Sequence, residues 1–205
     1  MKIIAHRGFW KSESEKNTIK AIKRAIDAGY GFETDFRDYG QTILISHNPP
    51  KGNEITAEEV FRIYQEAGSK EMLALNIKAD GLQDMMARLL QKYKITNYFF
   101  FDMSVCDTVI YVDKQLKIAS RRSEYEQELP FYKDSTTVWV DFFLNDNNVI
   151  PETKKYLNDG KIVCVVSPEL HKRDYYNLWS QLKNINHPNL YLCTDYPDKA
   201  KDFFK

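Results

Sequence analysis

Short apolar runs alternate along the chain with longer segments in which apolar residues recur every three or four positions. The short runs are rich in Ile, Val, Phe and Tyr, a composition typical of buried strands. They predict eight strands, at Lys2–Ala5, Gly31–Phe36, Met72–Ile77, Tyr98–Phe101, Lys117–Ser120, Thr136–Val140, Lys161–Val166 and Leu190–Cys193. Residues 42–46 are interpreted as a polar-tipped continuation of the second strand.

The segments with helical periodicity carry their own boundary signals: Asn17 or Thr18 as an N-cap, and Gly29 and Gly68 as stops. The predicted helices include segments within residues 17–29, 56–68, 80–93, 104–114, 151–160 and 196–205. Strands that alternate with helices are parallel, and eight of them, each followed by a helix, predict a small α/β fold, a closed (β/α)8 TIM barrel without a sizeable insertion domain. The alternative is an open doubly wound sheet, but the first strand lacks the Gly-rich phosphate turn of that fold.

Composition limits the classes of function. The 205 residues are expected to form one domain, residues 1–205, and 29 basic residues balance 29 acidic ones, which argues against a nucleic-acid partner. Three widely spaced cysteines without a CxxC pair are expected to be reduced thiols. We find neither a signal peptide nor an apolar run long enough for stable membrane insertion, so a cytoplasmic location is expected.

Polar residues follow many of the predicted strands, and in barrels of this kind the chemistry collects at the carboxyl ends of the strands. These residues are His6, Arg7, Glu33, Asp35, His47, Asn76, Lys78, Arg121, Arg122, Asp141 and Asp195. His171 and His187 fall in a helix candidate and a turn and are interpreted as surface residues. Taken alone, His6 and Arg7 would be ordinary surface residues at a first turn.

The stretch "FETDFRD" carries the strongest chemical signal. On a strand, side chains two positions apart share a face, so Glu33 and Asp35 project together. Two adjacent carboxylates repel each other, and a divalent cation with a preference for oxygen ligands removes that repulsion. The alternative is a solvated pair on an edge strand, but the second strand of a closed barrel has no free edge.

Six segments, taken in order, resemble the glycerophosphodiester phosphodiesterase family. They are "AHRG" at 5–8, "NT" at 17–18, "FETDFR" at 32–37, "SHNPP" at 46–50, "LNIK" at 75–78 and "CTDYPDKA" at 193–200. "HRG" alone is a weak signal, but its combination with E-x-D, a downstream His and a closing "TDYP" is specific. The resemblance spans nearly the whole chain. It implies a (β/α)8 barrel fold and a metal-dependent phosphodiesterase activity. The family is related to the bacterial phosphatidylinositol phospholipases and to spider sphingomyelinase D.

By this resemblance, His6 and His47 are the general acid and base, and Arg7 and Lys78 bind the phosphate. The residue types suit these roles. Imidazoles with a pKa near ~6.5 can both take and give a proton at neutral pH. The planar guanidinium group of an arginine can donate hydrogen bonds to two phosphate oxygens at once, whereas a lysine supplies a single point charge.

The resemblance makes Glu33, Asp35 and the position of Asn76 the metal ligands, for Mg²⁺ or Ca²⁺, with Mn²⁺ as a further candidate. Asn76 departs from the family, which usually has a carboxylate there. An amide oxygen can ligate a hard cation but brings no charge, so metal affinity should be weaker, or the substrate phosphate must supply the missing charge. Lys16 and Asn48 also replace residues that are commonly acidic in the family.

The sequence therefore predicts a divalent-metal-dependent phosphodiester hydrolase for a small-molecule, glycerol- or polyol-linked substrate. Arg121, Arg122 and Asp141 at the mouth are candidates for binding a larger anionic or sugar-bearing group, and the alternative is that they are solvated rim residues. A second hypothesis is a catalytically weak or inactive barrel that binds phosphates or sugar phosphates, because Asn76 replaces a carboxylate. A lipid hydrolase would require an exposed apolar rim. Phe9 and Trp10 could begin one, but we expect them to pack under the first helix.

Overall fold

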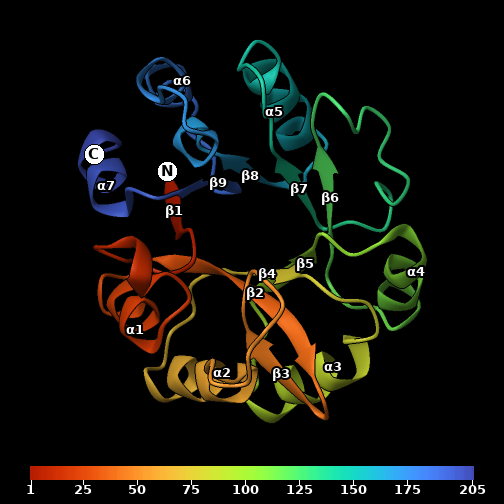
Figure 1. The fold of residues 1–205 in the computed structure, drawn as a ribbon. Coiled ribbons are helices and arrows are strands. Elements are labelled where there is room, and N and C mark those ends of the chain that lie inside the picture. The colour runs from red at the N-terminus through yellow and green to blue at the C-terminus, as the bar shows by residue number, and fades with distance from the viewer.

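Eight parallel strands form a nearly closed barrel surrounded by helices (Figure 1). The computed structural model describes all 205 residues. The strands are β1 (Lys2–Ala5), β2 (Gly31–Tyr39), β4 (Leu73–Ile77), β5 (Tyr98–Phe101), β6 (Ala119–Arg122), β7 (Thr137–Val140), β8 (Ile162–Val166) and β9 (Leu190–Thr194). They pair in the order β5-β4-β2-β1-β9-β8-β7-β6, and β3 (Thr42–Ile45) forms an antiparallel hairpin with β2. The predicted fold class is confirmed.

The helices form an outer layer around the strands (Figure 1). They are α1 (Ile19–Asp27), α2 (Ala57–Glu66), α3 (Gln83–Lys92), α4 (Val105–Asp113), α5 (Val149–Asn158), α6 (Tyr176–Leu182) and α7 (Pro197–Phe203), with 3₁₀ turns η1 (Glu13–Glu15) and η2 (Pro168–His171). Thr18 caps α1, and Thr56 and Glu59 form a reciprocal capping box on α2. None of these helices combines the length and apolar character needed to cross a membrane.

The expectation of a helix after every strand is wrong at one place. Residues 123–136, between β6 and β7, form a loop, and Figure 1 shows it between α4 and α5. This stretch contains Pro130 near its middle, and a proline inside a helix removes a backbone hydrogen bond and clashes with the preceding turn. The Glu124 carboxylate instead accepts backbone N–H bonds from Phe143, Leu144 and Asn145, which tie the loop to the one after β7.

The barrel is weakest where β5 meets β6. All other neighbouring strands pair over two or more residues, but these two share a single bridge between Phe100 and Ile118. The Phe100 N–H donates to the carbonyl of Lys117 at 2.9 Å. We refer to this junction as the β5–β6 seam.

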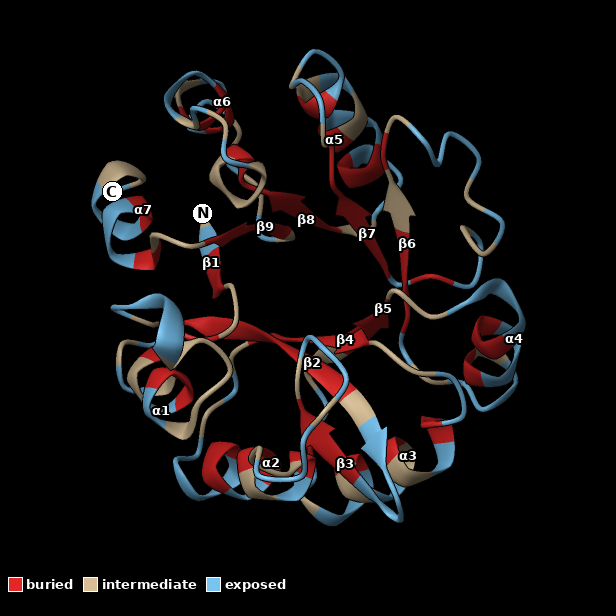
Figure 2. Ribbon diagram, in the orientation of Figure 1, coloured by how far each residue is buried: buried red, intermediate tan, exposed pale blue.

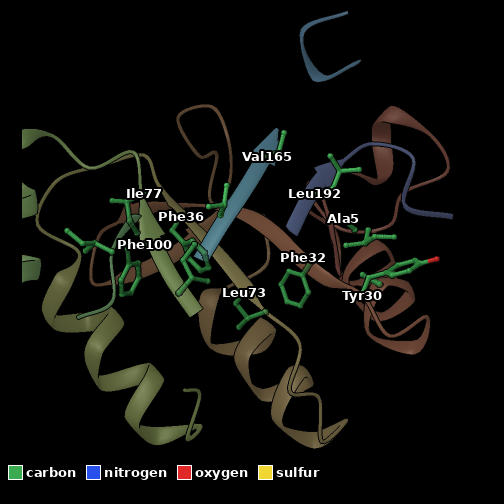
Figure 3. Close-up of a cluster of buried hydrophobic side chains, with 14 of the residues drawn as sticks. Ala5, Tyr30, Phe32, Phe36, Leu73, Ile77, Phe100, Val165 and Leu192 are labelled. Carbon is green, nitrogen blue, oxygen red and sulfur yellow. The ribbon is translucent and has the colours of Figure 1, made fainter. Parts of the chain in front are cut away.

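Strand side chains alternate between two apolar clusters. The larger cluster lies between the sheet and the helices and includes Phe32, Leu73 and Phe100, seen between strands and helices in Figure 3. The smaller cluster fills the barrel interior with residues such as Ile4 and Trp139. Figure 2 shows most of the strand residues as buried, with the carboxyl ends of β2 and β6 less so. Interior positions turn polar at the carboxyl ends of the strands, which places the predicted site residues at the barrel mouth.

Candidate active site

The turn after β1 places His6 and Arg7 at the mouth. Arg7 and Gly8 adopt left-handed backbone angles, with φ of 55° and 81°. A Cβ at Gly8 would lie 2.8 Å from the backbone of Ala21 in α1, so only glycine allows this close approach. The turn directs the Arg7 N–H to Glu33 Oε2 at 3.0 Å, and this contact links the first two strands at their ends.

His6 is oriented by a carboxylate that the sequence analysis did not assign to the site. Its Nδ1 lies 2.7 Å from Asp195 Oδ1, directly after β9, and its Nε2 lies 3.9 Å from Glu33 Oε2. A carboxylate on one ring nitrogen fixes the tautomer and leaves the other nitrogen for chemistry. Asp195 does not cap the last helix, because Tyr196 holds the N-cap position of α7.

Glu33 and Asp35 face the barrel interior, as the alternation of β2 predicts, while Phe32 and Phe36 pack outward. The register pairs Asp35 with Asn76 of β4. Asn17 donates to Asp35 Oδ2 at 2.8 Å and accepts from the Thr34 hydroxyl at 2.7 Å. Asn17 therefore positions Asp35 and is not a helix cap.

Three oxygens in this cluster are buried without a hydrogen-bond partner: Glu33 Oε1, Asp35 Oδ1 and Asn76 Oδ1. A buried oxygen without a donor is costly, and three together on neighbouring strands fit the ligand preference of a hard cation. The set has two carboxylates and one amide, and no group of three or more His, Cys, Asp and Glu side chains has the geometry of a metal site. The residues fit a divalent ion bound with fewer protein charges than the family usually supplies.

The pKa of Glu33 is raised from 4.5 to about 7, mainly by burial and then by the neighbouring charge of Asp35. His6, Arg7 and Lys78 act in the opposite direction but do not cancel the burial. Near neutral pH, the Glu33 carboxyl group is therefore only partly ionised in the absence of a bound cation.

Lys78 begins a chain of charged contacts that crosses the mouth to the opposite strands. Its Nζ lies 3.8 Å from Asp35 Oδ1 and 3.1 Å from Asp102 Oδ2, directly after β5. Asp102 also pairs with Arg121 across the β5–β6 seam, and Arg121 Nη1 lies 3.5 Å from Asp141 Oδ2. The structure thus brings Lys78, Arg121 and Asp141 into one network, with Asp102 as a link that the sequence analysis missed.

The network ends at a histidine that was interpreted as a surface residue. His171 Nε2 lies 2.7 Å from Asp141 Oδ1, and its side chain is 20% exposed. His187 only accepts a hydrogen bond from the nearby Asn189 N–H. Arg122 turns outward to Glu152 of α5, at 2.9 Å, and does not reach the mouth.

His47 lies apart from this network, in the exposed loop after β3. Its Nδ1 is 3.0 Å from Asn48 Oδ1, and no carboxylate orients it. It lines a cavity of about 440 Å³ together with Arg7, Asn17 and Lys16. The predicted proton-transfer partner of His6 therefore shares a cavity with the predicted phosphate ligand, Arg7.

Phe9 and Trp10 do not form an exposed apolar rim. Phe9 packs edge-on against Tyr30 at 5.8 Å, and the Trp10 indole N–H donates to the His6 carbonyl. Both residues are half-buried.

Comparison with known proteins finds proteins of similar structure but none of similar sequence. No family model matches the chain, and no curated protein matches it. A glycerophosphodiester phosphodiesterase from Agrobacterium tumefaciens str. C58 superposes with a TM-score of 0.72 at 12% identity, covering 99% of this chain and 98% of that one. The chain has the fold of the glycerophosphodiester phosphodiesterases.

Two further structures share this phosphodiesterase fold. A phosphodiesterase from Oleispira antarctica, in complex with the product sn-glycerol-3-phosphate, gives a TM-score of 0.71 at 14% identity over 99% of this chain and 96% of that one. A Ca²⁺-dependent phosphatidylinositol-specific phospholipase C from Streptomyces antibioticus gives 0.64 at 11% identity over 100% and 96%. The resemblance read from the sequence is thus confirmed at the level of the fold.

Proposed function

We propose that the protein is a phosphodiester hydrolase that uses a divalent metal ion, Mg²⁺, Ca²⁺ or Mn²⁺, on a diester of glycerol or another polyol. The observation that carries this proposal is the group of three unpartnered buried oxygens, on Glu33, Asp35 and Asn76, beside the oriented His6. The phosphodiesterase fold supports it, and the bound product in the Oleispira structure is a small phosphate ester of the expected kind.

The charges around the mouth favour a bound cation. Five carboxyl groups face three permanent cations, which leaves two negative charges when all five are ionised and both histidines are neutral; the groups are Glu33, Asp35, Asp102, Asp141, Asp195, Arg7, Lys78 and Arg121. A phosphodiester anion is repelled by such a site. Glu33, Asp35 and Asn76 would hold the ion, which would neutralise this charge and polarise a phosphoryl oxygen.

The chain's own residues supply binding and proton transfer. Arg7 and Lys78 bind phosphoryl oxygens by charge-assisted hydrogen bonds. His6, held at Nδ1 by Asp195, exchanges a proton at Nε2, and His47 exchanges the second proton across the cavity. One imidazole takes the proton of the attacking water or substrate hydroxyl as its oxygen bonds to phosphorus. The other imidazole protonates the departing alkoxide as the ester P–O bond breaks.

The test is hydrolysis of bis(p-nitrophenyl) phosphate and of glycerophosphodiesters with each metal or with EDTA. We expect metal-dependent turnover that His6→Ala and Glu33→Ala both abolish, while the matched control His187→Ala retains it. Turnover that is unaffected by EDTA would contradict the metal role, and activity retained in His6→Ala would contradict the proton-transfer role.

A second candidate is a barrel that binds polyol phosphates without efficient catalysis. Two observations favour it: Asn76 stands where the family has a carboxylate, and His47 lacks an orienting carboxylate. Absence of turnover on every diester, together with binding of sn-glycerol 3-phosphate by calorimetry, would support this candidate over the hydrolase.

A further inference from the structure

The turn η2 is fixed over the mouth by contacts to three strand ends. Leu170 packs against the apolar cluster that fills the barrel interior. The Glu169 carboxylate accepts hydrogen bonds from the Thr194 hydroxyl and from the Asp195 N–H, at the end of β9. Arg173 then donates to Asp146 and to the Phe142 carbonyl in the loop after β7, both at 2.7 Å. The residue between these anchors, His171, therefore has a defined position above the mouth.

His171 has one ring nitrogen engaged and one free. Nε2 contacts Asp141 Oδ1 at 2.7 Å, whereas Nδ1 has no partner. Asp141 is 6% exposed, and its other oxygen is taken up by Trp139 and Arg121. The carboxylate therefore cannot turn away, and it fixes the direction of the free nitrogen.

Two aromatic side chains lie beside the His171–Asp141 pair. The Phe143 ring lies 4.6 Å from the His171 ring, and Tyr125, 72% exposed, lies 6.0 Å from Phe143. The Glu124 carboxylate joins the two loops that carry these rings through its bonds to residues 143–145. Accessible aromatic faces beside a polar group suit a ligand with a carbon skeleton and hydroxyl groups.

The arginine on this side of the mouth is already engaged by carboxylates, so it offers no free positive charge to a phosphate. Arg121 contacts three carboxylates, those of Asp102, Asp141 and Glu126. Asp141 is in turn paired with Arg121 and His171. By contrast, the Arg7 and Lys78 side adjoins the unpartnered oxygens. The phosphate therefore belongs on the β1–β4 side, and a neutral hydroxyl-bearing group belongs beside His171.

We propose that His171, oriented by Asp141, forms a subsite with Phe143 and Tyr125 that binds the alcohol portion of a polyol or sugar phosphodiester. His171 Nδ1 hydrogen-bonds a hydroxyl of that alcohol, and the aromatic rings pack against its carbons. The inference rests on the proposed function and assigns the part of the substrate that the phosphate machinery does not recognise.

The test uses two chromogenic diesters of p-nitrophenyl phosphate that differ only in hydroxyl groups, one esterified with glycerol and one with n-propanol. We expect wild type to prefer the glycerol diester, and His171→Ala to lower its kcat/KM about tenfold while the propyl diester changes less than about threefold. His171→Asn, which keeps a donor, should recover part of the loss. His187→Ala is the matched control.

An equal loss on both diesters, or no loss on either, overturns the subsite. If wild type hydrolyses neither diester, the hydrolase proposal fails, and calorimetry with sn-glycerol 3-phosphate and n-propyl phosphate decides the subsite separately. A preference for the glycerol ester that His171→Ala removes supports it. The same affinity for both esters in wild type overturns it.

Discussion

Replacing Glu33 by Gln should stabilise the metal-free protein at alkaline pH, although the change removes a proposed metal ligand. The pKa of Glu33 is raised from 4.5 to about 7 because the carboxyl is buried beside Asp35. The folded state thus holds a proton that the unfolded chain releases, so Glu33 costs stability progressively as the pH rises from about 4.5 to about 7, and the full cost persists above that. At about 1.4 kcal/mol for each tenfold change in proton affinity, this cost is roughly 3 kcal/mol.

Glutamine is neutral at every pH and keeps an oxygen that can accept the Arg7 N–H bond. We expect Glu33→Gln to exceed wild type by roughly 2–3 kcal/mol in urea unfolding at pH 8 with EDTA, or about 4–12 °C in Tm for a chain of this size. At pH 5 wild-type Glu33 is protonated, and the two proteins should be nearly equal. Glu128→Gln, at an exposed position, is the control and should change stability at neither pH.

Metal provides the complementary measurement. Saturating Mg²⁺, Ca²⁺ or Mn²⁺ should raise the Tm of wild type, because a ligand that binds only the folded state stabilises it, and should have much less effect on Glu33→Gln. If Glu33→Gln is less stable than wild type at pH 8 in EDTA, the surrounding cations favour the ionised carboxylate, and the argument from burial is refuted.

Four further outcomes are expected. Asp195→Asn should lower kcat on the order of 10²-fold, because His6 loses the partner that fixes its tautomer, and unchanged kcat with altered stability would assign Asp195 a structural role instead. Glu124→Ala should lower the free energy of unfolding at pH 7 by about 1–3 kcal/mol through lost backbone bonds. The backbone N–H donors outweigh burial and lower the pKa of Glu124 in the folded protein. The stability that Glu124 contributes is therefore complete above about pH 4.5 and is lost as the pH falls through the lower pKa of the folded state. Equal pH dependence of the stability of Glu124→Ala and wild type would contradict this. In native protein one thiol, Cys106, should react with an aromatic disulfide reagent, because Cys164 and Cys193 are buried and burial raises the pKa of both; three fast-reacting thiols would contradict their burial.

The local part of the site could be predicted from the sequence. Alternation in "FETDFRD" places Glu33 and Asp35 on one face whatever the rest of the chain does. The barrel follows from eight apolar runs separated by helical segments, because parallel strands require crossovers. The connection after β6 was misjudged because the repeating pattern was extended over residues 123–136, where Pro130 disfavours a helix.

The remaining residues depend on contacts between distant parts of the chain. Asn17 looks like a helix cap, and only the fold brings its amide to Asp35, 18 positions away. Asp102 follows an apolar strand directly, which is a usable signal. His171 carries none, because its 3₁₀ turn has no pattern and Asp141 is 30 positions distant. Alternation along a strand fixes which face a residue takes but not the partner it meets across the mouth.

The β5–β6 seam makes the charged network part of the barrel's closure. Backbone pairing there is reduced to the Phe100–Ile118 bridge, and the Asp102–Arg121 ion pair spans the same gap. Opening the seam would separate these two side chains while leaving β1 and β2, which carry His6, Glu33 and Asp35, held together by their own ladder. The two sides of the mouth therefore differ in rigidity. The side proposed to hold the phosphate is held by the hydrogen bonds between β1 and β2, and the side proposed to receive the alcohol can open at the seam to groups of different width. In amide hydrogen exchange, β6 should lose its protection before β1 and β2.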